Sequence, residues 1–485
     1  MKTEILLDHE RVADGGYVVR ALLRITGEAP ETEDRPPLNL AVVLDRSGSM
    51  AAMGKLERAK EAASLLVRRL ADDDVVSVVS YDDEVRTVAG RTPGARRQEV
   101  LGGIAGLHPG GTTNLSGGWL RGRELVAEEM VAGKKAAEEP AETTTAAEAA
   151  AGERADETAA QELTDGAVNR VLLLTDGLAN VGITDPGRLR DLVASAAAKG
   201  VTTTTIGFGA DYDERLLQAL ADAGGGSTYY IEEPDQAPAV FEAEIEGLMA
   251  LAAQNVAVTV APAAAVEHAT VLQQYPRRQT DGGALRLELG DLYALEPKSL
   301  LTEFLIEDSA QGKGVAPAGQ GLATSRGELD ASQGATAVAT FTIEGHVLLP
   351  NGGVEKRTMT LPVRVSRGEA AVVNPEVRRE MLLLEAARAR EDALEDRARQ
   401  AYEAGARKLR RVAEKLAPYA ASDDELRDEV DDLRDLAERF DVEQVSTADA
   451  KYMYQRAYSR GQSKRAAADR LMEDRALARQ RRKRK

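Results

Sequence analysis

Residues 40–50, with the sequence LAVVLDRSGSM, decide the predicted fold. The first five residues are a continuous apolar run, which is typical of a strand buried on both faces of a parallel sheet. The chain then becomes polar at Asp45, Ser47 and Ser49, and an amphipathic helical pattern follows over residues 55–70. In open α/β sheets, ligands bind where a strand ends and such a loop begins. The stretch therefore predicts a strand, an oxygen-rich loop at a ligand site, and a helix.

The polar loop offers one carboxylate and two hydroxyls, which are hard ligands suited to Mg²⁺, Mn²⁺ or Ca²⁺. Because these groups do not complete a six-ligand shell, we expect further oxygens from other loops. Two stretches supply candidates: GGTTNL at residues 110–115, which leads into a helix, and VLLLTDG at residues 171–177, an apolar run that ends at Asp176. The sequence thus predicts a divalent-cation site that is built from three loops.

These three stretches, in this order, resemble the von Willebrand factor A (VWA) domain and its metal-ion-dependent adhesion site (MIDAS), over about residues 36–250. The resemblance implies that serine and threonine side chains bind the metal, Mg²⁺ (or Mn²⁺), and that aspartates bind it directly or through water. It also implies one coordination position for an Asp or Glu of a partner protein. All five motif positions are present, and they are Asp45, Ser47, Ser49, Thr112 and Asp176.

The resemblance implies a protein-interaction adaptor rather than an enzyme, with an AAA+ ATPase or a multiprotein complex as a plausible partner. The residues alone allow four alternatives to this interpretation. The loop could be a capped polar turn, or a metal-dependent hydrolase could use the same oxygens. A serine nucleophile has no nearby base except His108, which argues against triad chemistry. Binding could also run through the C-terminal helices without any metal.

Composition narrows the class of protein. The 485 residues carry a net charge of −18, which argues against broad nucleic-acid binding. Cysteine is absent, which fits a reducing compartment. The N-terminus lacks a long apolar segment, and the apolar window over residues 247–266 is broken by Gln254, Asn255 and Pro262. We therefore expect a cytoplasmic protein without a membrane span.

The predicted fold class is α/β, with a doubly wound, mostly parallel sheet, a β-sandwich and a C-terminal helical region. Residues 1–35 read as strands, residues 36–252 as the VWA domain, and residues 253–370 as strands parted by turns. We expect the strands of residues 1–35 to complete the sandwich, so that the VWA domain is inserted into it. Residues 133–167 carry few large apolar side chains and are predicted to be a disordered acidic insertion.

Residues 371–485 are expected to form antiparallel helices, of which the first carries one apolar stripe from Asn374 to Leu416. A second helix is predicted over residues 423–440, and a third from about Thr447 to the end of the sequence. Residues 479–485 form a basic tail that could contact nucleic acid or an acidic partner, with a solvated tail as the default.

The sequence also supports predictions for the acidic run of residues 82–84 and for the single tryptophan of the α/β region. The acidic run of residues 82–84 is expected to be a solvated hairpin, because it lacks the spacing and the glycine of an EF-hand. Trp119, the single tryptophan, is expected to pack beneath the loop at residues 110–115 rather than to contact a partner.

Overall fold

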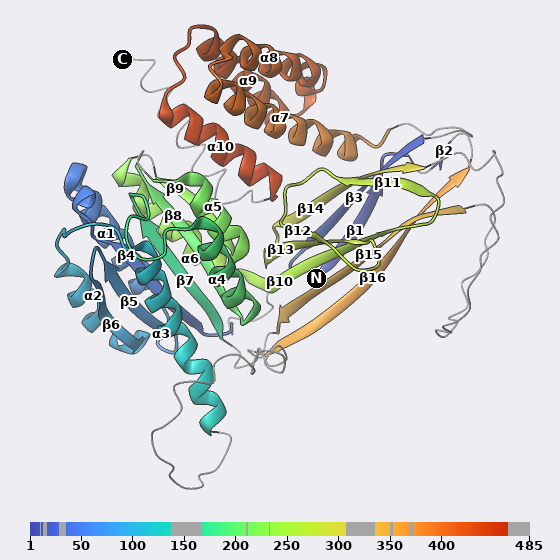
Figure 1. Ribbon diagram of the computed structural model, residues 1–485. Coiled ribbons are helices and arrows are strands. Elements are labelled where there is room, and N and C mark those ends of the chain that lie inside the picture. The colour runs from blue at the N-terminus through green and yellow to red at the C-terminus, as the bar shows by residue number, and fades with distance from the viewer. Residues whose placement is uncertain are drawn as a thin grey trace.

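The computed structural model describes residues 1–9, 11–12, 17–28, 35–136, 167–209, 212–231, 233–306, 335–349, 353–367 and 373–463. These residues form an α/β unit, a pair of β-sheets and a helical bundle above both (Figure 1). The predicted acidic insertion lies outside the described residues from 137 to 166. The predicted basic tail and the last part of the third C-terminal helix lie outside them as well.

The α/β unit is built on a six-stranded sheet with the order β6-β5-β4-β7-β8-β9. All neighbouring pairs are parallel except β5 with β6, so the prediction of a doubly wound, mostly parallel sheet is confirmed. The strands are β4 (Leu38–Asp45), β5 (Val75–Tyr81), β6 (Val85–Pro93), β7 (Val168–Thr175), β8 (Val201–Phe208) and β9 (Gly225–Ile231).

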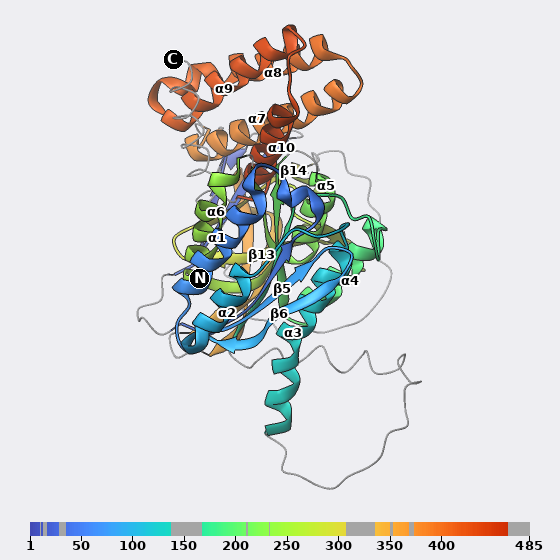
Figure 2. The same ribbon diagram turned by 90° about the vertical axis from the view of Figure 1, so that its left-hand side faces the viewer.

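Helices cover both faces of this sheet, as the view turned by 90° shows (Figure 2). The α-helices are α1 (Lys55–Arg69), α2 (Arg97–Ala105), α3 (Leu115–Ala136), α4 (Pro186–Ala198), α5 (Glu214–Ala223) and α6 (Ala237–Met249). Short 3-10 turns are η1 (Gly48–Gly54), η2 (Gly94–Arg96) and η3 (Pro234–Gln236). The continuous apolar run of β4 explains this layering, because its side chains point alternately to the two faces and both faces are buried.

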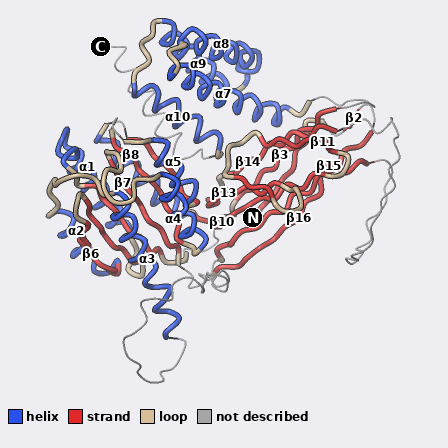
Figure 3. Tube along the Cα trace, viewed as in Figure 1, coloured by secondary structure: helices blue, strands red, loops and turns tan. Residues whose placement is uncertain are grey.

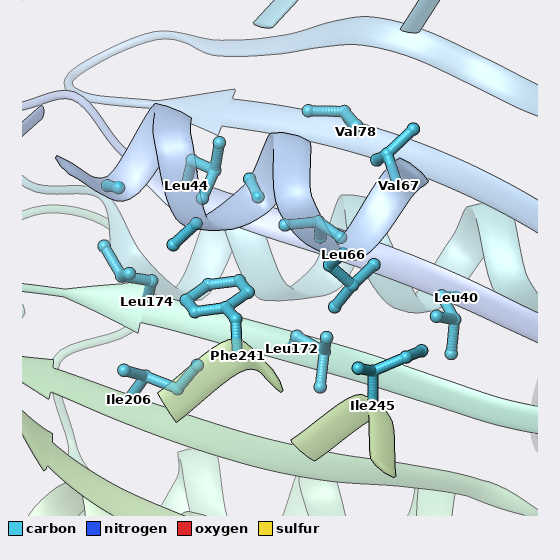
Figure 4. Packing of buried hydrophobic residues seen from close by; sticks show 14 of the residues in the cluster. Leu40, Leu44, Leu66, Val67, Val78, Leu172, Leu174, Ile206, Phe241 and Ile245 are labelled. Carbon is cyan, nitrogen blue, oxygen red and sulfur yellow. The ribbon is translucent and has the colours of Figure 1, made fainter. Parts of the chain in front are cut away.

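One face of the sheet packs against α1 and α6, where Leu40, Leu44, Leu172 and Phe241 interlock (Figure 4). The other face packs against α3, α4 and α5, and it includes Trp119. Trp119 is 1% exposed, and its indole nitrogen donates to Thr203 Oγ1 at 3.1 Å. It is therefore a core residue rather than a partner contact, and the contact that fixes it is with β8.

Two further sheets face each other beside the α/β unit (Figure 3). Their orders are β1-β3-β14-β11 and β12-β13-β10-β15-β16-β2, so strands from before and after the α/β unit lie in the same sheets. The early strands are β1 (Lys2–Leu7), β2 (Arg11–Val12) and β3 (Tyr17–Thr26). The later strands are β10 (Leu251–Pro262), β11 (Val266–Val271), β12 (Arg277–Gln279), β13 (Leu285–Tyr293), β14 (Pro297–Ile306), β15 (Ala335–Leu348) and β16 (Val354–Arg367).

The chain enters and leaves the α/β unit at nearly the same point. Gly27 follows β3 and accepts a backbone hydrogen bond from Leu295, at 3.0 Å, while Ala294 donates to Ala250 at 2.6 Å. A Cβ added to Gly27 would lie only 2.6 Å from the Cβ of Ala252, so the two crossings touch. The boundaries of the predicted domains stay predictions, but the two ends of the α/β unit are adjacent.

The C-terminal region comprises α7 (Pro375–Ala398), α8 (Tyr402–Leu416), η4 (Ala417–Ser422), α9 (Asp424–Asp441) and α10 (Thr447–Gly461). The expectation of a single stripe from Asn374 to Leu416 is wrong, because the helix breaks between α7 and α8. Gln400 has a φ of +59° at the break, a left-handed conformation that a continuing helix does not use. The two halves of the stripe fold back and bury each other instead.

Helix α10 contacts all three regions. Tyr458 donates to Asp222 of α5 at 2.7 Å, and Arg456 pairs with Glu429 of α9 at 2.9 Å. Gln274, which follows β11, donates its backbone N–H to the carbonyl of Gly461 at 3.1 Å. The helix therefore fixes the bundle against both the α/β unit and the sheets.

None of the helices in the described ranges has the length and the apolar character needed to cross a membrane.

Candidate metal centre

Asp45 ends β4, and its side chain is fully buried. Its Oδ1 accepts a hydrogen bond from the backbone N–H of Ser47 at 2.8 Å. Its Oδ2 accepts one from the Thr175 hydroxyl, also at 2.8 Å. Because one bond comes from the loop of Asp45 itself and the other from the end of β7, the carboxylate is held in one orientation at the carboxyl end of the sheet.

The two serines of the motif link this loop to the end of β7. Ser47 Oγ lies 3.1 Å from Ser49 Oγ, and Ser49 Oγ donates to Asp176 Oδ1 at 2.6 Å. Asp176 is fully buried, whereas Ser49 is exposed. Four of the predicted oxygen donors thus lie within one continuous group that opens to solvent at Ser49.

Two neighbouring threonines, Thr112 and Thr113, are candidates for the threonine ligand, and they differ in burial. Thr112, the predicted one, is exposed, whereas Thr113 is only 4% exposed. Thr113 faces the loop of Asp176, because a Cβ added to Gly177 would lie 3.4 Å from Thr113 Oγ1. The Thr113 carbonyl also accepts hydrogen bonds from the N–H groups of Asn180 and Val181, at 3.1 and 3.2 Å. Thr113 is therefore the threonine that the structure shows against the aspartate loop.

A buried lysine completes the centre, and its position at a helix start is the one feature of the sequence that points to it. Lys55 Nζ lies 2.8 Å from Asp176 Oδ2, and the lysine is only 4% exposed. Gly209, with a φ of +76°, leaves room for this side chain, because a Cβ there would lie 3.2 Å from Nζ. One ammonium thus pairs with Asp176, and together with the nearby Asp45 these three groups carry one excess negative charge when all are ionised.

Asp82 holds the glycine-rich loop in place, and the expectation that residues 82–84 are a solvated hairpin is wrong for this residue. Asp82 is 3% exposed and pairs with Arg46 at 2.8 Å. Its Oδ2 accepts from the Gly111 N–H at 2.9 Å. A Cβ on Gly110 would lie 1.8 Å from the same oxygen, so a side chain there would block the contact. The acidic run therefore contains a structural clamp between two loops.

The electrostatics of the centre favour an added cation. Burial raises the pKa of Asp45 to about 6, although its hydrogen bonds to Ser47 and Thr175 act in the opposite direction, and the nearby Asp176 raises it further. Within the described ranges, no three or more His, Cys, Asp or Glu side chains form a metal cluster. A cation at this place would therefore depend on hydroxyls as well as on the two carboxylates.

The arrangement does not resemble a nucleophile with its base. The hydroxyls of Ser47 and Ser49 are engaged with each other and with Asp176. His108 lies in an exposed part of the glycine-rich loop. The oxygens thus converge as ligands would, because hydroxyls and carboxylates that share one small space suit a hard divalent ion.

Comparison with known proteins gives the same family for the α/β unit. Residues 39–243 match the model of the von Willebrand factor type A domain. The chain is 29% identical over 240 residues to the uncharacterized protein YfbK of Escherichia coli, covering 49% of this chain and 36% of that protein. It is 28% identical over 324 residues to the uncharacterized protein sll0103 of Synechocystis, covering 64% of this chain and 68% of that protein. The chain thus spans only about a third of the first of these relatives.

Two solved structures share the architecture beyond the α/β unit. One is a von Willebrand factor type A protein from Catenulispora acidiphila, with a TM-score of 0.59, 17% identity and 87% coverage of both chains. The other is the ArnB paralog VWA2 from Sulfolobus acidocaldarius, with a TM-score of 0.53, 14% identity and coverage of 95% and 97%. At these identities the likeness shows the fold alone.

Proposed function

Because residues 39–243 form a von Willebrand factor type A domain, a module that commonly mediates protein–protein interaction, we propose that this chain binds a partner protein through a divalent cation. The cation would be held where β4 and β7 end, by Asp45, Ser47, Ser49 and Asp176. Mg²⁺ or Mn²⁺ fits this set of hard oxygens. When bound, the cation supplies a Lewis-acidic position that accepts a carboxylate oxygen of the partner.

The observation that carries the proposal is the hydrogen-bonded series of oxygens from Ser47 through Ser49 to Asp176, with separations of 3.1 and 2.6 Å. Two loops that are 127 residues apart in the sequence contribute to it. Buried carboxylates are unfavourable unless a positive charge compensates them. Lys55 compensates one of the two, and an additional cation would compensate the other.

For the threonine ligand we propose Thr113 in place of Thr112. The support is its burial and its position against Gly177, next to Asp176. The hydroxyl of Thr112 is in the exposed part of the same loop. The two adjacent threonines can be compared directly, because either can be replaced without changing the length of the loop.

The chain's own residues would position the ligands before any cation arrives. Thr175 and the Ser47 N–H orient the Asp45 carboxylate, and Asp82 fixes the glycine-rich loop through Gly111. Such preorganisation reduces the entropy that is lost on binding. The partner would be a protein with an exposed Asp or Glu. AAA+ ATPases and other multiprotein complexes, which the resemblance suggests, are the first candidates to test.

The test is a pulldown from native lysate with wild type and Asp45→Ala, each with Mg²⁺ and with EDTA. We expect a partner that only the wild type retains, and only with Mg²⁺. Asp281→Ala, in the exposed turn between β12 and β13, is the matched control and should behave as wild type. Retention of the partner in all conditions would contradict the proposal and favour metal-independent binding through the C-terminal helices.

A further inference from the structure

We propose that Met53 and Leu178 form an apolar rim beside the metal centre, and that the partner presents an acidic side chain with a large apolar residue next to it. This inference rests on the proposed function and adds the chemistry of the segment that the site selects. It concerns side chains that are not themselves ligands, so it can be tested separately from cation binding.

The rim is defined by its exposure. Met53 is 75% exposed and Leu178 is 51% exposed. Within the described part of the α/β unit, these two are the large apolar side chains that belong to the exposed class. Single exposed apolar residues are common on protein surfaces, so exposure alone decides nothing. What distinguishes this pair is its position.

Both residues belong to loops that carry proposed ligands. Met53 lies in η1, four residues after Ser49, and Leu178 comes two residues after Asp176. The hydrogen bond from Ser49 Oγ to Asp176 Oδ1, at 2.6 Å, joins the two loops. The two apolar residues therefore belong to the two loops that meet at the junction at which a partner carboxylate would arrive.

The backbone of Met53 points to a role outside the fold. Its φ is +51° and its ψ is +22°, a left-handed conformation that side chains with a Cβ disfavour, and the φ of Gly54 is +69°. A strained residue is usually retained for packing or for function. At 75% exposure Met53 contributes little to packing, so we assign the strained conformation to presenting the side chain outward.

The charges around the junction support an acidic and apolar partner. Residues 48–54 and 177–184 contain no charged side chain, in a chain in which 29% of residues are charged and the net charge is −18. An approaching carboxylate therefore meets no like charge from these two loops, although the molecule as a whole repels it. The same absence of charge suits contact with an apolar side chain next to the carboxylate.

Two synthetic peptides test the rim. One carries a single Glu between two Leu residues, and the other carries the Glu between two Ser residues, in an otherwise identical Gly-Ser sequence. In Mg²⁺, wild type should bind the Leu-flanked peptide about tenfold more tightly, the effect of partly burying one or two large apolar side chains. The variant Met53→Asn with Leu178→Ser should lose this preference. Asn suits position 53 because it tolerates a positive φ.

The controls separate this inference from the proposed function. The variant should keep the metal-induced rise in melting temperature of wild type, and Val442→Ser, which removes an exposed apolar side chain at the end of α9, should keep the peptide preference. Mg²⁺-dependent binding without a preference for Leu in wild type, or with an unchanged preference in the double variant, would overturn the rim alone. If neither peptide bound in a Mg²⁺-dependent way, both proposals would be wrong.

Discussion

Asp45 and Glu429 are both buried carboxyl groups, yet their pKa values move in opposite directions. Burial raises the pKa of Asp45 to about 6, and Asp176 adds to this effect. Burial would also raise the pKa of Glu429, but Arg390 and Arg456 outweigh it and lower the value to about 2. The negative charge of Glu429 is thus compensated by arginines in the helical bundle, whereas the charge of Asp45 in the α/β unit is not fully compensated.

The difference distinguishes a structural charge cluster from a candidate binding site. In the helical region, Arg390 pairs with Glu429 and Asp432, and Arg456 also pairs with Glu429, so the charges balance. At the strand ends of the α/β unit, Lys55 pairs with Asp176, whereas Asp45 is held by hydrogen bonds from Ser47 and Thr175. A deficit of positive charge, together with hydroxyls that open to solvent, is what a cation site requires before the cation binds.

The largest effect should come from breaking the balanced cluster. Glu429→Gln leaves Arg390 and Arg456 buried without their shared carboxylate, so we expect the free energy of unfolding to fall by about 3–5 kcal/mol. Urea unfolding followed by circular dichroism measures it. Glu403→Gln is the control, because Glu403 pairs with Arg407 at the surface, where its side chain is 86% exposed. A similar loss in both variants would refute the comparison.

At the candidate metal centre, we expect that removing a buried charge stabilises the protein. In EDTA, Asp45→Asn should raise the free energy of unfolding by about 2 kcal/mol at neutral pH, because it removes a buried charge whose pKa is raised by about two units. The amide can still accept from the Ser47 N–H and donate to the Thr175 hydroxyl. Urea unfolding of both proteins in EDTA gives the difference.

The pH dependence of that difference provides the check. The pKa of Asp45 is about 6 in the folded protein, whereas in the unfolded chain it has its ordinary value of 3.8. The cost of the buried charge is therefore fully present above pH 6 and disappears as the pH falls toward 4. A gain that did not change over this range would show that the variant stabilises the protein for another reason.

Replacing the buried threonine should weaken cation binding and leave the fold intact. Thr113→Ala should reduce the affinity for Mn²⁺ about tenfold, the order of effect of altering a residue next to a metal. Thr112→Ala should change it less than twofold, because that hydroxyl is exposed. Isothermal titration calorimetry measures both. A larger loss of Mn²⁺ affinity in Thr112→Ala than in Thr113→Ala would favour Thr112 as the threonine ligand.

The smallest effect is expected at the compensating lysine. Lys55→Met removes the ammonium beside Asp176 and increases the excess negative charge, so the affinity for Mn²⁺ should rise about fivefold. Lys199→Met, at the exposed end of α4, is the matched control. A weaker affinity in Lys55→Met would mean that the lysine mainly orients Asp176, and that its charge matters less.

The strands and their ends could be predicted because local sequence determines them. The apolar run before Asp45 has the length and the flanking prolines typical of a strand covered on both faces, and a second apolar run precedes Asp176. Parallel strands bring these two ends to one edge of the sheet, so the sequence predicts that the serines and aspartates lie close together. The structure brings Ser47, Ser49 and Asp176 together as that reasoning expects.

Other features could not be predicted because they depend on tertiary contacts. Thr112 and Thr113 are identical in type, and only the fold shows which of them is buried. Asp82 belongs to an acidic run that resembles solvated surface, and its partner Arg46 is 36 residues away. The helix breaks at Gln400, although neither glycine nor proline occurs there to predict the break. In each case, a long-range contact or a chain reversal overrides the local pattern.

The contact between Gly27 and Ala252 has a consequence for how such a protein can arise and be rebuilt. The chain leaves the two sheets and returns to them at adjacent positions. A gene segment that encodes the α/β unit could therefore be gained or exchanged as a cassette without disrupting the strand pairing of those sheets. For the same reason, an exchanged cassette would need no added linker. Its surface would have to match α10 where Tyr212, Glu214, Asp222 and Thr228 contact that helix. It would also have to match β13 where Arg170 pairs with Asp291.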